Sequence, residues 1–229
     1  MKLLGINADA KTSKGDKFGY MTGIMYLAPA NVSGFEVCPS RSEGCTAACL
    51  FTAGRGVYNN VRDARIRKTQ LLFSNRSEFL NNLKNDVRLL VKKAEKVGKI
   101  PCVRLNGTSD LGWEGLARDI MTEYSSVQFY DYTKVLTRMM RYCDGKLPNN
   151  YHLTFSRSEA NWLDCKKVLK AGGNVAAVFY KALPKTYEGY KVVDGDLSDL
   201  RFLDDKNVIV GLKAKGKAKY DTSNFVIFP

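Results

Sequence analysis

The sequence predicts an α/β protein whose largely parallel sheet forms a partial or closed (β/α) barrel. From Pro101 onward, short runs of β-branched and aromatic residues alternate with segments of helix-compatible apolar spacing, which is the rhythm of β-α-β units. The part before Pro101 holds a cysteine-rich loop and two longer helical segments. No low-complexity linker divides the 229 residues, so a single domain over 1–229 is expected.

Two long helices are expected ahead of the regular strands, over 59–73 and 78–97. Ser77 is expected to cap the second of them. Residues 18–28 and 32–37 read as extended segments that lead into the first cysteine. The apolar face of the second helix comprises Phe79, Leu83, Val87, Leu90, Val91 and Ala94.

The remaining elements largely alternate along the chain. Gly145 and Gly172 follow expected helices as stop signals. Because a helix is expected between each of the first four strands and the next, the sheet should be largely parallel. The expected strands are 102–107, 127–132, 151–156, 175–180 and 208–211, and the expected helices are 115–124, 134–143 and 159–170.

Polar and apolar side chains alternate along the expected strands. Since successive side chains of a strand point to opposite faces, the polar faces of three neighbouring strands would line one shared cavity. Such a polar lumen indicates a chamber for a small polar or anionic ligand. The alternative is an open sheet whose second face is merely solvated. The expected ligand-binding residues are Asn106, Tyr130, Tyr132, Thr154 and Ser156.

Arg104, Asp110 and Asp131 are the expected catalytic residues of this chamber. A buried guanidinium needs an anionic partner, so Arg104 would bind either a protein carboxylate or the ligand. Asp110 and Asp131 would be its partners or proton carriers. His152, the one histidine, is expected to be a hydrogen-bonded lumen residue rather than a metal ligand. Turns and surface caps are the expected roles of Asp194, Asp196, Asp199 and Asp204.

Cys38, Cys45 and Cys49 form a C-x6-C-x3-C arrangement inside an expected cluster-binding loop and helix over 37–56. Cys45 and Cys49 are one helical turn apart, and the loop returns Cys38 to the same point. Arg41 would supply positive charge to the thiolates. Soft thiolate ligands select zinc, copper(I) or iron–sulfur clusters. Structural zinc sites usually have a paired second half, so a 4Fe-4S cluster is expected, with zinc or unbound structural cysteines as the alternatives.

Cys102, Cys143 and Cys165 are expected to lie away from this cluster. They begin a strand, end a helix and lie inside a helix. A strand of five or six residues spans about 17–20 Å, which separates Cys102 from a cluster at the carboxyl edge. One iron is therefore expected to lack a cysteine ligand and to face the chamber.

Four stretches of the sequence carry a resemblance to a known family. They are 38–56 (CPSRSEGCTAACLFTAGRG), 104–110 (RLNGTSD), 193–204 (VDGDLSDLRFLD) and 210–216 (VGLKAKG). The chain resembles the phage "gene product eighty-eight" family, which implies a phage- or prophage-borne protein and supplies no activity. Its layout is also similar to that of radical S-adenosylmethionine enzymes, which implies S-adenosylmethionine as a further cofactor, although the cysteine spacing departs from their C-x3-C-x2-C pattern.

The formal net charge of +13 favours anionic partners. The basic residues are spread along the chain, so a nucleic-acid partner and an ordinary solvated surface both remain open. No run approaches the length of a membrane span and no signal peptide is recognisable at the start, so no membrane partner is expected. A cytoplasmic protein is expected, in the host cytoplasm if phage-encoded.

The leading functional prediction is an iron–sulfur protein, a redox or radical enzyme that acts on a small polar ligand. Two alternatives stay beside it. One is a nucleic-acid-binding protein braced by a closed cluster or zinc, and the other is an electron-transfer protein without a chamber.

Overall fold

The computed structural model describes residues 1–6, 13–52 and 54–228. The strands are β1 Leu4–Ile6, β2 Tyr20–Met25, β3 Ile100–Arg104, β4 Gln128–Thr133, β5 Tyr151–Ser156, β6 Val175–Phe179, β7 Thr186–Tyr187, β8 Tyr190–Asp194, β9 Ile209–Lys213 and β10 Val226–Ile227. The α-helices are α1 Glu43–Ala47, α2 Asn59–Ser74, α3 Arg76–Lys96, α4 Trp113–Leu116, α5 Arg118–Glu123, α6 Leu136–Cys143 and α7 Trp162–Lys170. The 3-10 helices are η1 Ser13–Phe18, η2 Leu50–Thr52, η3 Gly54–Val57, η4 Arg201–Leu203 and η5 Gly216–Tyr220.

One sheet organises the described residues, with the strand order β1-β2-β3-β4-β5-β6-β9-β8-β7 and β10 paired to β6. The pairs at the two ends of this path, β1–β2 and β8–β7, are antiparallel. All neighbouring strands from β2 along the path to β8 pair in parallel. The α/β class and the largely parallel sheet are confirmed. The prediction of a closed barrel is wrong, because the path ends at β1 on one side and at β7 on the other.

The long helices agree with the expected ones, and their boundary differs in one detail. Asn75 ends α2 and caps α3, accepting a hydrogen bond from the Glu78 amide at 3.1 Å, where Ser77 was the expected cap. The helix expected over 115–124 is divided into α4 and α5 at Ala117. Residues 32–37 form turns and loop instead of an extended element. The β7–β8 hairpin was not anticipated.

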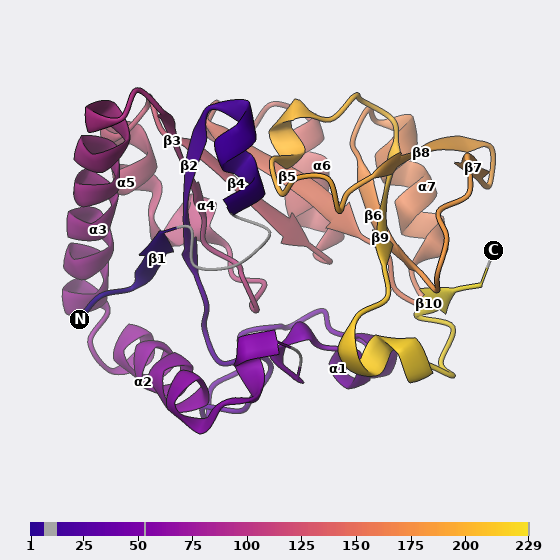
Figure 1. The fold of residues 1–229 in the computed structure, drawn as a ribbon, viewed down its shortest axis with the longest axis horizontal. Helices are drawn as coiled ribbons and strands as arrows, with labels where there is room; N and C mark the ends of the chain where they lie inside the picture. The colour runs from indigo at the N-terminus through magenta and orange to yellow at the C-terminus, as the bar shows by residue number, and fades with distance from the viewer. Residues whose placement is uncertain (7–12, 53, 229) are drawn as a thin grey trace.

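The two faces of the sheet are covered differently. Val103 and Phe129 belong to the main apolar core, which also contains Phe79 of α3. Cys102 and Tyr130, one residue away along the same strands, pack instead against Leu200 just before η4. Figure 1 shows α3, α6 and α7 on one side of the sheet and η1 and η4 on the other. The period-two alternation therefore separates a helix-covered face from a second face closed by short 3-10 segments.

The parallel strands end at one common edge, and the cysteine-bearing segment runs along it. In Figure 1 the chain between β2 and α2 passes beneath the strand ends, and α1 lies beside the C-terminal segment. Sites in α/β proteins are built at such carboxyl edges, because loops from several strands meet there. Within the described ranges, no helix combines the length and apolar composition needed to cross a bilayer.

Candidate functional site

Cys38 is held between the segment after β2 and the loop after β3. The Ala30 amide donates to Cys38 Sγ at 3.4 Å, and Sγ lies 3.7 Å from the Thr108 carbonyl oxygen. One residue earlier, the Val37 carbonyl accepts the Asp110 amide at 2.8 Å. These contacts place the first expected ligand against the carboxyl end of β3.

Cys45 lies in α1, which is docked by a carboxylate from the loop after β5. Ser42 caps α1 and accepts the Cys45 amide at 3.1 Å. Glu159 accepts from Ser42 Oγ at 2.8 Å and from the Gly44 amide at 2.9 Å. Burial favours the neutral form of Glu159, but hydrogen bonds from its own amide, Gly44 and Ser42 hold its pKa below the usual range. An added Cβ at Gly44 would lie 2.6 Å from Phe225 Cβ, so the glycine permits this close docking.

Cys49 completes the cysteine site beside two cationic side chains. Burial raises the pKa of the Cys49 thiol, and the neighbouring Cys45 raises it further. A backbone hydrogen bond from Phe51 and the positive charges of Arg65 and Lys134 lower it. Burial likewise raises the pKa of Cys38 to about 11, with Cys49 and Cys45 adding to the shift. The three thiols therefore share one electrostatic neighbourhood. Across the described part of the chain, no three His, Cys, Asp or Glu side chains are positioned to hold a metal ion.

Arg41 and the remaining cysteines lie outside this neighbourhood. Arg41 forms an exposed ion pair with Glu36, instead of supporting the thiols as expected. Cys102 contacts Thr22 Oγ1 at 3.2 Å on the second face of the sheet. The Cys165 thiol donates to Asn161 at 3.5 Å on α7, and Cys143 ends α6.

The expected chamber residues on β3 and β4 do share a face, but a protein segment covers it. Arg104 Nη1 donates to the Asp199 carboxylate at 3.0 and 3.2 Å, and Tyr130 Oη donates to it at 3.2 Å. The Arg104 guanidinium lies over the Tyr132 ring, 4.6 Å from its centroid. Asp199 is 1% exposed, so the aspartate expected as a turn or cap residue is the buried partner of Arg104.

On β5 the second face carries a neutral histidine. Tyr142 Oη lies 2.7 Å from His152 Nδ1, and Thr154 Oγ1 lies 3.5 Å from Nε2. Burial lowers the pKa of His152 to about 4, and Arg201 lowers it further. Thr154 is fully buried, whereas Ser156 at the end of the strand is half-buried. His152 therefore has the hydrogen-bonded role expected for it.

Asn106 has a different role from the expected one. Its Oδ1 accepts from Ser109 Oγ at 2.8 Å and from the Leu111 amide and Trp113 Nε1, each at 3.0 Å. The backbone N–H of Asn106 donates to Asp131 Oδ1 at 2.6 Å. The Asn106 side chain thus closes the loop after β3, and its acceptor oxygen is committed to that loop instead of a ligand chamber.

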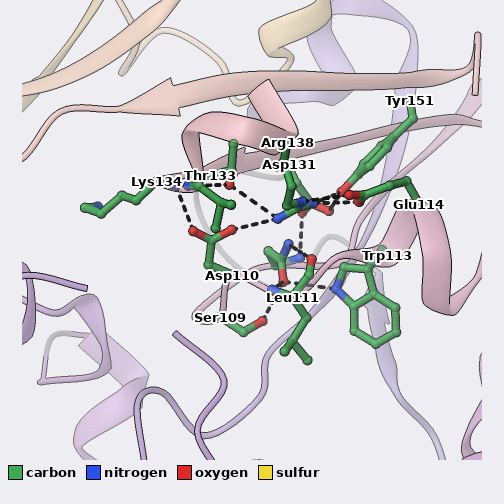
Figure 2. Close-up of polar contacts among 12 residues, drawn as sticks. Ser109, Asp110, Leu111, Trp113, Glu114, Asp131, Thr133, Lys134, Arg138 and Tyr151 are labelled. Atoms are coloured by element: carbon green, nitrogen blue, oxygen red, sulfur yellow. Dashed lines mark hydrogen bonds and ion pairs between the residues drawn. The ribbon is translucent and has the colours of Figure 1, made fainter. Parts of the chain in front are cut away.

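Asp110 and Asp131 meet in a buried network on the helix side of the sheet, around Arg138 of α6 (Figure 2). Arg138 donates to both carboxylate oxygens of Glu114 at 2.9 Å and to Asp110 at 2.8 Å. It also donates to Tyr151 Oη at 3.1 Å, and Tyr151 donates to Asp131 at 2.9 Å. Burial raises the pKa of Asp131 to about 7 despite hydrogen bonds that favour its charged form.

The carboxylates expected as partners of Arg104, Asp110 and Asp131, both lie in the Arg138 network on the other face of the sheet. Asp199 partners Arg104, whereas Asp110 partners Arg138. Burial raises the pKa of Asp110, and a hydrogen bond from Lys134 and the Arg138 charge oppose the rise. Asp110 also acts on the thiol of Cys38 through its charge. This places Asp110, alone of the three expected catalytic residues, in electrostatic contact with the cysteine site.

The chain matches the model of a known protein family. No curated protein and no solved structure matches the chain. The model of the family described as Gene product 88 matches residues 1–228. With the match spanning the described sheet, the cysteine segment and the C-terminal segment alike, the chain belongs to the Gene product 88 family.

Proposed function

We propose that the protein binds a 4Fe-4S cluster through Cys38, Cys45 and Cys49 and acts in a redox or radical reaction on a small polar or anionic ligand. The observation that carries the proposal is the gathering of these three thiols at the carboxyl edge of the sheet. Cys38 contacts the loop after β3, and Cys45 packs with Ala48, Ala214 and other apolar residues near the C-terminus. Thiolate sulfur is the ligand that iron–sulfur clusters require.

The strand order supports this assignment. Strands β2, β3, β4, β5, β6 and β9 are neighbours in the sheet in the order in which they follow along the chain. Helices α3, α6 and α7 lie on one side of these strands (Figure 1). We propose that this array serves as a partial barrel, with the cysteine segment following its first parallel strand, β2. Radical S-adenosylmethionine enzymes share that layout, so S-adenosylmethionine is the cofactor proposed for the open iron.

The surrounding groups suit a thiolate-rich centre. Arg65 and Lys134 place positive charge near Cys49, which favours the deprotonated ligand. Thiol protons must leave when metal binds, and the three ligands must close around it. Bound there, the cluster would supply an electron to a ligand held at the same edge. The charge of Asp110 raises the pKa of the Cys38 thiol, so this carboxylate lies near the cysteine site. Asp110 is the group proposed to exchange a proton with the ligand.

Zinc bound by the same thiols is the first alternative, and a nucleic-acid-binding protein is the second. The second is favoured by the exposed Lys213, Lys217 and Lys219, which surround Ala214 and Ala218 of the apolar cluster that includes Cys45. A phosphate-driven binder loses affinity steeply as the salt concentration rises. A ligand enzyme shows little such dependence, so binding of single-stranded DNA at two salt concentrations separates the two functions.

Anaerobic purification tests the cluster directly. The purified protein should be brown and contain about four irons and four sulfides per chain. Cys45→Ser or Cys49→Ser should bleach it. Cys143→Ser is the matched control, because Cys143 is partly exposed and lies at the end of α6. Stoichiometric zinc without inorganic sulfide would show that the zinc alternative is correct.

The open iron is tested on the reduced protein. S-adenosylmethionine or cyanide should shift its electron paramagnetic resonance spectrum, because a non-cysteine position can exchange its ligand. Cys102→Ser should leave the cluster intact. Loss of the cluster in this variant, with folding retained, would identify a fourth cysteine ligand and favour electron transfer alone.

A further inference from the structure

Arg65 is a buried cation with two guanidinium nitrogens that find no hydrogen-bond partner among the described residues. The residue lies on α2 and is 8% exposed. Its Nε and Nη1 atoms are buried and have no hydrogen-bond acceptor among the residues that the structure describes. The guanidinium carbon instead lies 4.7 Å from the centroid of the Tyr26 ring and 5.4 Å from that of Phe51. Aromatic faces attract a cation but do not accept its in-plane N–H groups as a carboxylate does.

Among the residues that the structure describes, no carboxylate offsets the charge of Arg65. Burial lowers the pKa of Arg65, and the groups that oppose this are Tyr26 and Cys49, a phenol and a thiol. An isolated buried charge is costly, and side chains of this kind are normally paired. Buried arginines elsewhere in the fold follow that rule, since Arg104 pairs with Asp199 and Arg138 with Glu114.

Arg65 shares a neighbour, Tyr26, with a second group of residues that carries unsatisfied polar atoms. Tyr26 favours the charged form of Arg104 as well as that of Arg65, so both arginines lie in its electrostatic surroundings. Arg104 Nε and Tyr132 Oη are likewise buried without a hydrogen-bond partner among the described residues. The neighbourhood of Tyr26 therefore combines one unneutralised cation with polar atoms that can donate hydrogen bonds.

Gly56 keeps one side of the Arg65 guanidinium free of a side chain. An added Cβ at Gly56 would lie 3.4 Å from Arg65 Nη1 and 2.5 Å from the Phe51 carbonyl oxygen. Even alanine would therefore crowd the backbone at Phe51 and approach the unsatisfied nitrogen. The glycine therefore lets the Phe51 backbone lie close beside the buried, unsatisfied Nη1.

We propose that Arg65 is the charged anchor of a binding site for a small oxyanion, a carboxylate or a phosphate, beside Tyr26 and Cys49. A planar guanidinium matches the oxygen spacing of both groups, and a buried position strengthens the charge-assisted hydrogen bonds. This site deepens the proposed function by giving its anionic ligand an anchor next to the cysteine cluster. The binding step does not need the cluster, so it can be tested with and without iron.

The test uses the full chain with 15N-labelled arginine. Inorganic phosphate and oxalate are titrated separately by calorimetry and by the Nε–H signal of Arg65, which distinguishes a phosphate from a carboxylate site. Arg65→Met should weaken binding of the preferred anion by at least roughly tenfold, because a charge-assisted pair is lost. The anion affinity of Arg65→Lys should lie between those of the unchanged protein and Arg65→Met, because an ammonium group keeps the charge but cannot donate two parallel hydrogen bonds. The control is Arg62→Met, on the same helix and over the same Phe51 ring, which is exposed and should bind as the unchanged protein does.

Arg65→Met should fold, because methionine keeps the apolar stem and removes an unpaired charge, and its urea midpoint reports this. Equal weakening in Arg65→Met and Arg62→Met would show general surface charge and overturn the proposal. Failure of both anions to bind would also overturn it. A third contrary result is an Arg65 signal that shifts on iron loading and ignores both anions, since the cluster would then be the counterion. Arg65-dependent anion binding to protein that never takes up iron would support this site while the proposed cluster fails.

Discussion

Replacing Arg138 by methionine is expected to destabilise the protein more than most single substitutions. Arg138 is 8% exposed and makes charge-assisted hydrogen bonds of 2.8–2.9 Å to Asp110 and Glu114. Methionine retains the packing of the stem but donates nothing to either carboxylate. The two carboxylate side chains, 12% and 7% exposed, would be left without their shared cation.

The magnitude follows from what is left behind. Removing one partner of a buried ion pair costs about 3–5 kcal/mol, because the remaining charge stays out of water. Here one arginine serves two carboxylates, so the loss for Arg138→Met should reach that range at pH 7. Without the arginine, whose charge lowers the pKa of Asp110, that pKa should rise further. A carboxyl whose folded-state pKa is raised loses stability as the pH rises, so the deficit should be larger at pH 7 than at pH 5.

Urea unfolding followed by tryptophan fluorescence is the assay. Trp113 reports on this region, because its indole donates to Asn106 in the loop that carries Asp110. Arg141→Met, on the exposed side of the same helix, is the control and should change stability by less than about 0.5 kcal/mol. Adding Glu114→Gln to Arg138→Met should recover part of the loss. A loss below about 1 kcal/mol for Arg138→Met, or one that does not depend on pH, would refute the reasoning.

Three further predictions concern individual groups around the site. Asp131→Asn should flatten the fall in unfolding free energy between pH 4 and pH 7, because the Asp131 pKa is raised to about 7 and the charged form is therefore penalised as the pH rises. The substitution should remove a fall in unfolding free energy of at most about 4 kcal/mol, and an unchanged pH profile would contradict the raised pKa. Glu159→Gln should increase amide hydrogen exchange at Gly44 and Cys45, because the charge-assisted bonds that dock α1 are lost, whereas normal protection would show that α1 docks without them. Gly44→Ala should cost about 1–3 kcal/mol in urea unfolding and reduce bound iron, because its Cβ would press on Phe225; an unchanged urea midpoint would show that α1 can shift freely.

The two-faced character of the strands could be predicted from the sequence, because it depends on local periodicity. The alternation of Val103 with Arg104 and of Phe129 with Tyr130 correctly indicates which side packs on the helices. What fills the other side depends on a segment far along the chain. Asp199 reaches Arg104 across 95 residues of sequence, and no local pattern reports such a pairing.

The predictions of a closed barrel and of a ligand-binding role for Asn106 do not match the structure, for related reasons. Barrel closure depends on whether the first and last strands meet, and the β7–β8 hairpin occupies the edge beyond β9. Asn106 continues the polar phase of β3 but lies past its end at Arg104, where the backbone turns and the alternation no longer sets direction. Period-two reasoning is valid only while the chain remains extended.

The cysteine spacing predicts that three thiols lie near one another, whereas nothing in the sequence analysis singled out Arg65. A signal was present, since Arg65, Thr69 and Leu72 recur at helical spacing and all three are buried. An arginine on the inward stripe of a helix is the unusual feature in that pattern. Arg138 is a second arginine at a buried helix position, since it and Met139 are both buried on α6.

The docking of α1 by Glu159 and Phe225 has a consequence for the order of events during synthesis. The cysteines leave the ribosome before the carboxylate and the apolar residues that position their helix, since Glu159 follows Gly44 by 115 residues and Phe225 comes later still. Arg104 likewise waits for Asp199. A nascent chain with only its first half released therefore carries three thiols without the framework that brings them together. Loading of the proposed cluster should accordingly follow synthesis of these later segments, and a chelator should compete best before they emerge.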